Sequence, residues 1–366
     1  MKKIIFTTFS FCLLLSQTIF AQSYSSPESV EFDYANNRYL IANKSANQIL
    51  ARAADGAISV FANAPGSPHG IEIVGDTLYC CTGSNLRAFN LNTGVQIFVQ
   101  LIESNAFLNG ITHDPAGNLY ITGFSSKKVY LFNTATRQSS VFVNNTTTTP
   151  NGIIYDAYDG VNPRLVLAGW GTPATIKSIS LANSNISLLV STPFGNIDGI
   201  AKGKNGNFYI SCWNPSSTIQ RYDSTFANAP TAMVTTGLSS PADIFYNVIT
   251  DTLAVPHGSN NGSNVNFYYF GTLTAQKSNL HVNDMNIYPN PSDGIIQISG
   301  LNANLKNLSL NLFEIGTGKQ VFSQNIGNLN QNESINLKNN QVSSGIYLLE
   351  LSSTEGFISR KKLIIE

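Results

Sequence analysis

Polar side chains that could bind a cation recur at nearly constant spacing between residues 27 and about 270. Each copy reads Pro or an aliphatic residue, then a polar residue, often Gly, and then Ile or Val. The polar residues are Glu28, His69, Asn109, Asn151 and Asp198, and the sixth copy has Ala242 followed by Asp243. Carboxylate, amide and imidazole groups gathered in one small space suit a hard divalent cation, with water completing its coordination. They can act together only if the fold brings six distant segments to one place.

The spacing of the six copies predicts such a fold. Their starts lie 41, 40, 42, 47 and 44 residues apart, and each is followed by a short apolar run, a hairpin-type turn and further short β-type runs. Four strands in a unit of about 40–45 residues is the pattern of a propeller blade. A β-solenoid is the alternative repeat architecture, but solenoid coils are much shorter. The sequence therefore predicts an all-β chain with a six-bladed β-propeller over residues 22–271.

A propeller would gather the repeated polar residues around its axis, because the first strand of every blade lines the central channel. Glu28, Asn151 and Asp198 are then candidate ligands of one divalent cation, which could be calcium, zinc or magnesium. The glycine that follows the polar residue in four copies would allow close backbone approach there. The alternative for any one of these residues, His69 included, is a structural role, since polar residues at strand starts also form turns and caps.

The loops after the second strand of each unit would form the rim of the same mouth. They contain both tryptophans of the chain, Trp170 and Trp213, together with Phe124 and His257. Apolar walls with a few polar groups at the bottom are typical of a ligand pocket. Trp170, Trp213 and His257 are therefore predicted to contact a substrate, and packing alone is the alternative for a single rim tryptophan.

At these residues the chain resembles the regucalcin/gluconolactonase family of six-bladed propellers. In that family a Glu starting the first blade, an Asn-Gly starting the fourth and an Asp-Gly starting the fifth hold one divalent cation, and Glu28, Asn151 and Asp198 match them. The resemblance implies that Asn109 contacts substrate or metal-bound water. The segment 107–110 lacks the Arg and the Asp that the family commonly carries there, which departs from its sugar-lactone pattern. Other segments also resemble NHL-type and streptogramin-lyase-type propellers, which include pure binding scaffolds.

The resemblance implies a metal-dependent hydrolase of a lactone or related ester. The cation would polarise the carbonyl and lower the pKa of a bound water. Asp198 would guide or deprotonate that water, while Asn109 and His69 would orient the substrate. One alternative is a non-enzymatic propeller that binds a glycan, a peptide or a cell-surface partner. Another is a relative of the lactonases that keeps the metal for stability alone.

The N-terminus has the pattern of an exported protein. Lys2 and Lys3 precede a largely apolar stretch that ends in a small residue at Ala21, which predicts a signal peptide over residues 1–21. A membrane anchor is the alternative, but the stretch is short and has no basic flank after it. No later segment is long and apolar enough to span a bilayer.

The charge balance argues against a nucleic-acid-binding protein, and the cysteine spacing argues against a zinc site or a disulfide framework. Lys plus Arg and Asp plus Glu both number 21, and charged residues make up only 11% of the chain. Nucleic-acid binders carry a clustered basic excess instead. Outside the leader, Cys80, Cys81 and Cys212 lack the spacing of a zinc site or a disulfide framework. They are predicted to be buried packing residues.

The composition changes after Gly271. Residues 272–284 are polar and predict a linker, and residues 285–366 carry strand patterns that predict a small β-sandwich. The Tyr-Pro-Asn-Pro-Ser-Asp-Gly segment at 288–294, the later Ser-Gly-Ile-Tyr and the terminal Lys-Lys-Leu-Ile-Ile resemble the type IX secretion sorting domain of Bacteroidetes bacteria. That resemblance implies export through the periplasm and recognition by the outer-membrane translocon. The product would then be secreted or held on the cell surface.

Overall fold

The computed structural model describes residues 23–158, 161–259, 263–270, 285–299, 308–314, 320–327, 334–338, 342–353 and 356–366. The signal peptide predicted over residues 1–21 and the linker predicted over 272–284 lie outside these residues. Within them the chain is made of strands and one 3-10 turn, η1 (Lys44–Ala46), with no α-helix. The predicted all-β class is confirmed. No helix in this part of the chain is long and apolar enough to cross a membrane.

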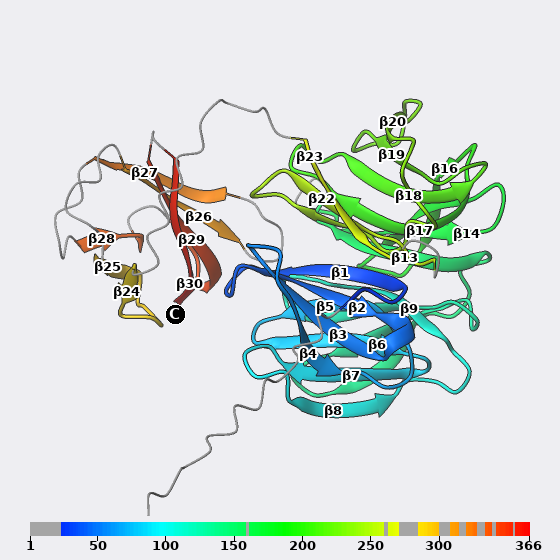
Figure 1. Ribbon diagram of the computed structural model, residues 1–366, viewed down its shortest axis with the longest axis horizontal. Coiled ribbons are helices and arrows are strands. Elements are labelled where there is room, and N and C mark those ends of the chain that lie inside the picture. The colour runs from blue at the N-terminus through cyan, green and yellow to red at the C-terminus, as the bar shows by residue number, and fades with distance from the viewer. Residues whose placement is uncertain are drawn as a thin grey trace, which may run out of the picture.

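Residues 27–269 form six antiparallel sheets that follow one another along the chain (Figure 1). The first two sheets contain β1 (Pro27–Asp33), β2 (Arg38–Asn43), β3 (Gln48–Ala53) and β4 (Ile58–Asn63), then β5 (Pro68–Val74), β6 (Thr77–Thr82), β7 (Asn85–Asn90) and β8 (Gln96–Leu101). The third and fourth contain β9 (Leu108–His113), β10 (Asn118–Gly123), β11 (Lys128–Asn133) and β12 (Gln138–Val143), then β13 (Thr149–Asp156), β14 (Arg164–Trp170), β15 (Thr175–Ser180) and β16 (Ile186–Ser191).

The last two of these sheets differ in size. The fifth contains β17 (Gly195–Lys202), β18 (Phe208–Asn214), β19 (Thr218–Tyr222) and β20 (Thr231–Val234), and the sixth contains β21 (Phe245–Asn247), β22 (Thr252–Pro256) and β23 (Val265–Tyr269). The repeat predicted four strands in every unit, so the sixth sheet, with three described strands, departs from it.

The first strands of the six sheets contact one another in order. β1 contacts β5, β5 contacts β9, and the series continues through β13 and β17 to β21, which also contacts β1. The backbone N–H of Asp243 donates to the carbonyl of Glu28 at 2.8 Å and joins the sixth sheet to the first. The repeated polar residues, far apart in sequence, therefore lie around a common centre.

Glycine follows the polar residue where neighbouring first strands approach too closely for a side chain. A Cβ added to Gly70 would lie 2.2 Å from the carbonyl oxygen of Asn109, and one added to Gly110 would lie 2.4 Å from that of Asn151. A Cβ added to Gly152 or to Gly199 would likewise lie 2.8 Å or 2.5 Å, respectively, from the nearest backbone atom of the next sheet. Real Cβ atoms do not approach other atoms this closely, so the strand spacing requires glycine.

Buried hydroxyl groups connect the same strands. Thr122 of β10 accepts from the N–H of Gly110 at 2.8 Å and donates to the carbonyl of Asn151 in the next sheet, also at 2.8 Å. Ser211 of β18 accepts from Gly199 at 2.7 Å and donates to the carbonyl of Ala242 at 2.8 Å. Each hydroxyl thus satisfies backbone groups of two successive sheets that would otherwise be buried without a partner.

The apolar core lies between neighbouring sheets. One cluster, for example, joins Leu40 and Ile49 of the first sheet to Ile71 and Leu78 of the second. The three cysteines Cys80, Cys81 and Cys212 are free and buried within these clusters, as predicted. Burial raises the pKa of the Cys212 thiol to about 12, which makes it unreactive at neutral pH.

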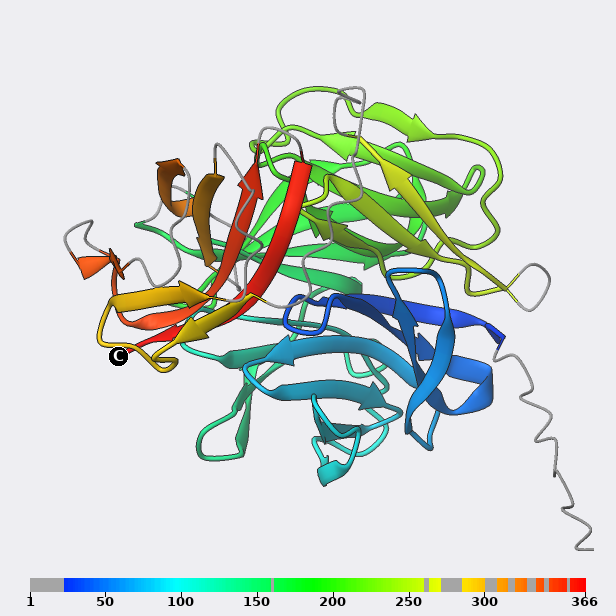
Figure 2. The same ribbon diagram turned by 60° about the vertical axis from the view of Figure 1, so that its left-hand side comes forward.

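The C-terminal strands form two further sheets, seen beside the first six in Figures 1 and 2. One contains β24 (Asn286–Tyr288), β25 (Ile295–Ser299) and β28 (Ser334–Asn336), and the other contains β26 (Leu308–Glu314), β27 (Gln320–Gly327), β29 (Gly345–Ser353) and β30 (Gly356–Ile365). Ile296 and Ile298 of one sheet and Leu310 and Leu349 of the other belong to a single buried cluster. This segment therefore has a core of its own.

The close approach of first strands predicts a large cost for one added methyl group. In Gly110→Ala the new Cβ would push the strand away from Asn151, and we expect a loss of about 2–4 kcal/mol in the free energy of unfolding. Gly75→Asn serves as the control, because Gly75 (φ +58°) has nothing within 4 Å of its Cβ position and Asn tolerates this conformation. Thermal denaturation of both variants measures the difference, and equal melting temperatures would show that the strands can separate freely.

Candidate functional site

The three predicted cation ligands lie near the starts of β1, β13 and β17 and are almost fully buried. Glu28 is 6% exposed, Asn151 1% and Asp198 3%. The Asn151 amide donates from Nδ2 to Asp198 Oδ1 at 3.0 Å, while its own Oδ1 has no hydrogen-bond partner. A buried amide oxygen without a partner is costly. It is also a ready ligand for a hard cation beside the two carboxylates.

Carboxylates crowd this centre. Burial raises the pKa of Asp198 well above its usual range, and the charges of Glu28 and Asp243 raise it further. Burial likewise raises the pKa of Asp243 to about 7, against a hydrogen bond of 2.8 Å donated by Ser29, with Glu72 and Glu28 raising it as well. Placing these acids together in the interior is unfavourable unless protons or cations offset their charge.

Lys44 supplies one positive charge that sequence reasoning did not assign. It begins η1 directly after β2, and its Nζ lies 2.5 Å from Glu28 Oε2. Its charge lowers the pKa of Asp198 against the larger effects of burial and the neighbouring acids. Glu28, Lys44, Asn151 and Asp198 therefore form one electrostatic cluster, which we call the polar centre.

His69 and Asn109 lie in the adjacent first strands β5 and β9 and are buried. His69 Nδ1 lies 2.7 Å from the carbonyl of Ser67, which can only accept, so Nδ1 carries the proton and Nε2 is left as an acceptor. Burial lowers the pKa of His69, and the charge of Lys44 adds to this shift. The imidazole is therefore neutral at pH 7, and it can accept a hydrogen bond or a proton.

A continuous series of aromatic rings runs across the second to fifth sheets at the same ends of the strands. His69 meets Phe107 at 4.9 Å between ring centroids, and Phe107 meets Phe124 at 5.6 Å. Phe124 meets Trp170 at 5.8 Å, and Trp170 meets Trp213 at 4.9 Å, with every contact edge-to-face. Trp170 pairs with Thr149, and Trp213 follows Cys212, which pairs with Ile197. Both tryptophans therefore lie beside the strand segments that carry Asn151 and Asp198.

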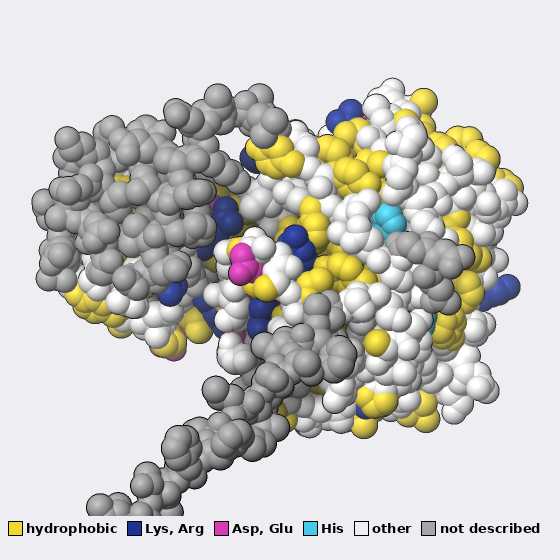
Figure 3. Space-filling model, in the orientation of Figure 1, with side chains coloured by type: hydrophobic (Ala, Val, Ile, Leu, Met, Phe, Trp, Pro, Cys, Tyr) yellow, Lys and Arg dark blue, Asp and Glu magenta, His cyan; other side chains and the backbone are white. Residues whose placement is uncertain are grey.

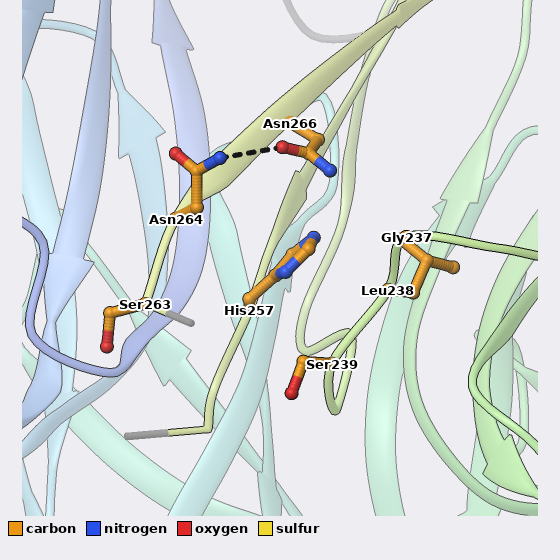
Figure 4. Close-up of a pocket in the computed structure, with 7 residues that line it drawn as sticks. All are labelled: Gly237, Leu238, Ser239, His257, Ser263, Asn264 and Asn266. Carbon is orange, nitrogen blue, oxygen red and sulfur yellow. Dashed lines mark hydrogen bonds between the residues drawn. The ribbon is translucent and has the colours of Figure 1, made fainter. Parts of the chain in front are cut away.

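His257 lines a different cavity, of about 450 Å³, together with Gly237, Leu238, Ser239, Ser263, Asn264 and Asn266 (Figure 4). None of the other predicted site residues lines it. The side chain is 4% exposed and its Nε2 has no hydrogen-bond partner, while burial lowers its pKa. The backbone around His257 nevertheless approaches the predicted mouth, because Pro241, which pairs with His257, accepts from Trp213 Nε1 at 2.9 Å. A substrate contact shared by His257 and the tryptophans stays a prediction.

Further along the first strands lies a second polar group that the sequence did not indicate. His113 Nδ1 lies 2.5 Å from Glu72 Oε1, and that carboxylate raises the pKa of the imidazole against the effect of burial. Burial, Glu72 and Asp243 raise the pKa of Glu31 well above its usual range. Across the described ranges, no cluster of three or more His, Cys, Asp or Glu has metal-binding geometry. The polar centre offers two carboxylates and an amide instead.

The surface near these elements is mostly uncharged. In the view of Figure 3, side chains of Lys, Arg, Asp and Glu are scattered among apolar and neutral polar ones. This agrees with the 11% charged residues of the chain. Glu28 and Asp198, near the starts of β1 and β17, are instead buried.

The C-terminal part of the chain matches a known family, and the part before it is similar in fold to solved structures. Residues 286–366 match the family described as secretion system C-terminal sorting domain. A search of curated protein sequences found no match. Solved structures of similar fold include a gluconolactonase from Xanthomonas campestris, at 14% identity and a TM-score of 0.55, covering 64% of this chain and 84% of that one.

Two further structures show how broadly the fold is used. A calcium-binding regucalcin from Agrobacterium tumefaciens matches at 16% identity and a TM-score of 0.53, covering 65% of this chain and 83% of that one. A nidogen/laminin complex matches at 12% identity and a TM-score of 0.50, covering 79% and 93%. At such low identities the likeness establishes the fold alone.

The pKa of Asp243 predicts a pH dependence of stability. An Asp ionises near pH 4 in the unfolded chain and at about 7 here, so the folded protein binds the extra proton between these values. The contribution of this pKa shift to the free energy of unfolding is complete below pH 4 and is lost as the pH rises to 7. Because Asn does not ionise, the free energy of unfolding of Asp243→Asn should fall by about 2–4 kcal/mol less than that of wild type over this pH range. Chemical denaturation from pH 5 to 8 measures it, with the exposed Asp55→Asn as control, and parallel curves for wild type and Asp243→Asn would contradict it.

The sorting-domain match indicates secretion or attachment to the cell surface and an interaction with the secretion system. The six sheets before it have the propeller-type fold of the gluconolactonase and regucalcin structures. Residues 286–366 thus belong to the secretion system C-terminal sorting domain family, and they follow a gluconolactonase- and regucalcin-like propeller.

Proposed function

We propose that residues 22–271 form a six-bladed β-propeller that binds one divalent cation and hydrolyses a lactone or related ester. A signal peptide would direct the chain to the periplasm. Residues 285–366 would form a β-sandwich that the type IX outer-membrane translocon then recognises. Residues 272–284 would link the two parts. The mature protein would act outside the cell or on its surface.

The main support for the cation site is the Oδ1 atom of Asn151, which is buried beside Asp198 and has no hydrogen-bond partner. Glu28 adds a second carboxylate, and its charge raises the cost of ionising Asp198. A divalent cation bound by Glu28, Asn151 and Asp198 would satisfy the amide oxygen and offset both carboxylates. The oxygen donors fit calcium or magnesium well, and zinc less well because it prefers nitrogen and sulfur ligands.

The residues of the chain suggest a division of work in ester hydrolysis. The bound cation would supply charge stabilisation for the carbonyl oxygen and acidify a water molecule. The water oxygen would bond to the carbonyl carbon while its proton passes to an Asp198 oxygen. Asp198 would then return that proton to the leaving alkoxide oxygen as the ester C–O bond breaks, which gives the acid and the alcohol and restores the carboxylate. Asn109 and the acceptor Nε2 of His69 would orient the substrate. The aromatic series would hold its apolar part and exclude water.

The main alternative is a non-enzymatic propeller that binds a glycan, a peptide or a surface partner. The Lys44–Glu28 ion pair favours it, because an ammonium already neutralises one proposed ligand. The fold likeness to the nidogen/laminin complex is consistent with a binding role. The two functions differ in whether the wild-type protein holds a cation.

Cation content tests the proposal directly. We expect about one calcium or magnesium per full-length chain after purification without chelator, and its loss in the double variant Glu28→Gln/Asp198→Asn. The double variant Asp55→Asn/Glu103→Gln, which removes two acids from other parts of the surface, should keep the cation. Elemental mass spectrometry measures the content, and a screen of lactones and esters on the same samples measures hydrolysis. A wild type that holds no cation with calcium and magnesium supplied would exclude the hydrolase and leave the binding propeller.

The aromatic series gives a second test. Trp170→Ala removes one ring beside Asn151, and we expect KM for a hydrolysed ester to rise roughly fivefold or more with kcat little changed. Tyr158→Ala, beyond the opposite end of β13, is the matched control. An unchanged KM in Trp170→Ala would assign this tryptophan to packing.

A further inference from the structure

Lys44 is held in place by the turn that carries it. Asn43, the residue before η1, accepts from the N–H of Ser25 at 2.6 Å through its side chain. The N–H of Ser45 donates to the carbonyl of Ser25 at 3.1 Å. These contacts tie the turn to the segment that leads into β1, so Lys44 starts from a fixed position beside Glu28.

The Lys44 ammonium is paired with one of the two carboxylate oxygens of Glu28. Nζ lies 2.5 Å from Oε2, and the side chain of Glu28 is only 8% exposed. The Lys44 side chain is 26% exposed and has a flexible stem, so its ammonium can turn out to water when displaced. A divalent cation bound by the same carboxylate would repel the ammonium at this distance, so the ion pair opposes cation binding.

We propose that Lys44 is a tethered counter-ion of the polar centre that competes with a divalent cation for Glu28 and thereby sets the cation affinity of the site. The inference rests on the cation site of the proposed function. With Lys44 on Glu28 the centre is partly neutralised, and cation binding must first break this ion pair. The apparent affinity is then the intrinsic affinity multiplied by the fraction of molecules in which the pair is broken.

Replacing Lys44 by Met separates this role from a merely structural one. The Met side chain keeps most of the apolar stem and removes the charge, which leaves Glu28 free for a cation. We expect the full-length Lys44→Met protein to bind Ca²⁺ or Mg²⁺ roughly tenfold or more tightly than wild type. Lys44→Arg, which keeps the charge, should bind like wild type. So should Lys204→Met, which removes an exposed lysine paired with Asp251.

Isothermal titration of each cation into chelator-treated protein measures the affinities, and the rise in melting temperature with cation gives an independent readout if a variant is less stable. Equal affinities, weaker binding in Lys44→Met, or no binding to either protein would overturn the inference. Cation binding to wild type without lactone or ester hydrolysis would contradict the proposed function alone. Binding to Lys44→Met but not to wild type would support the competition and remove the cation from the native function.

Discussion

Close backbone contacts between the first strands of successive sheets determine where the repeated polar residues lie. The contacts at Gly110 and Gly152 leave no room for a Cβ. Between β9 and β13, the Thr122 hydroxyl accepts from the N–H of Gly110 and donates to the carbonyl of Asn151. The residue before each glycine is thereby held at the centre, whatever its side chain. Packing between the sheets fixes this frame, and the chemistry depends on one side chain in each sheet.

Crowding at the centre creates an electrostatic problem that the fold must solve. The charges of Glu28 and Asp243 raise the cost of ionising Asp198, that of Glu28 also raises the cost of ionising Asp243, and the interior offers little water to screen them. A proton on Asp243, the ammonium of Lys44 and a divalent cation are three ways to offset this charge. They are not equivalent, because only the cation would also use the free oxygen of Asn151.

The sequence predicted the all-β class because turns and short apolar runs recur with a regular period, and it predicted close approach at the repeated glycines. The roles assigned to Glu28, Asn151 and Asp198 remain predictions, although the structure brings these residues to one centre. Lys44 lies in the first of the predicted rim loops, but its charge was given no role, because its pairing with Glu28 depends on how η1 folds back on β1. His257 was placed with the tryptophans because the rim loops are equivalent in order; its side chain lines a cavity together with Leu238 and Asn266, and its contact with the same substrate stays a prediction. The position of a loop follows from the repeat, whereas the direction of a side chain depends on local packing.

The fold tolerates such changes of chemistry, since structures as different as a gluconolactonase and a nidogen/laminin complex share it with this chain at 12–14% identity. A frame held by glycine and backbone contacts does not depend on the charge of the neighbouring residue. One lysine beside one glutamate can therefore shift a centre of this kind between holding a cation and holding its own counter-ion without altering the sheets. At the proposed site, the energy of the Lys44–Glu28 pair relative to that of a bound cation sets whether the chain can hold the cation that the proposed hydrolase needs.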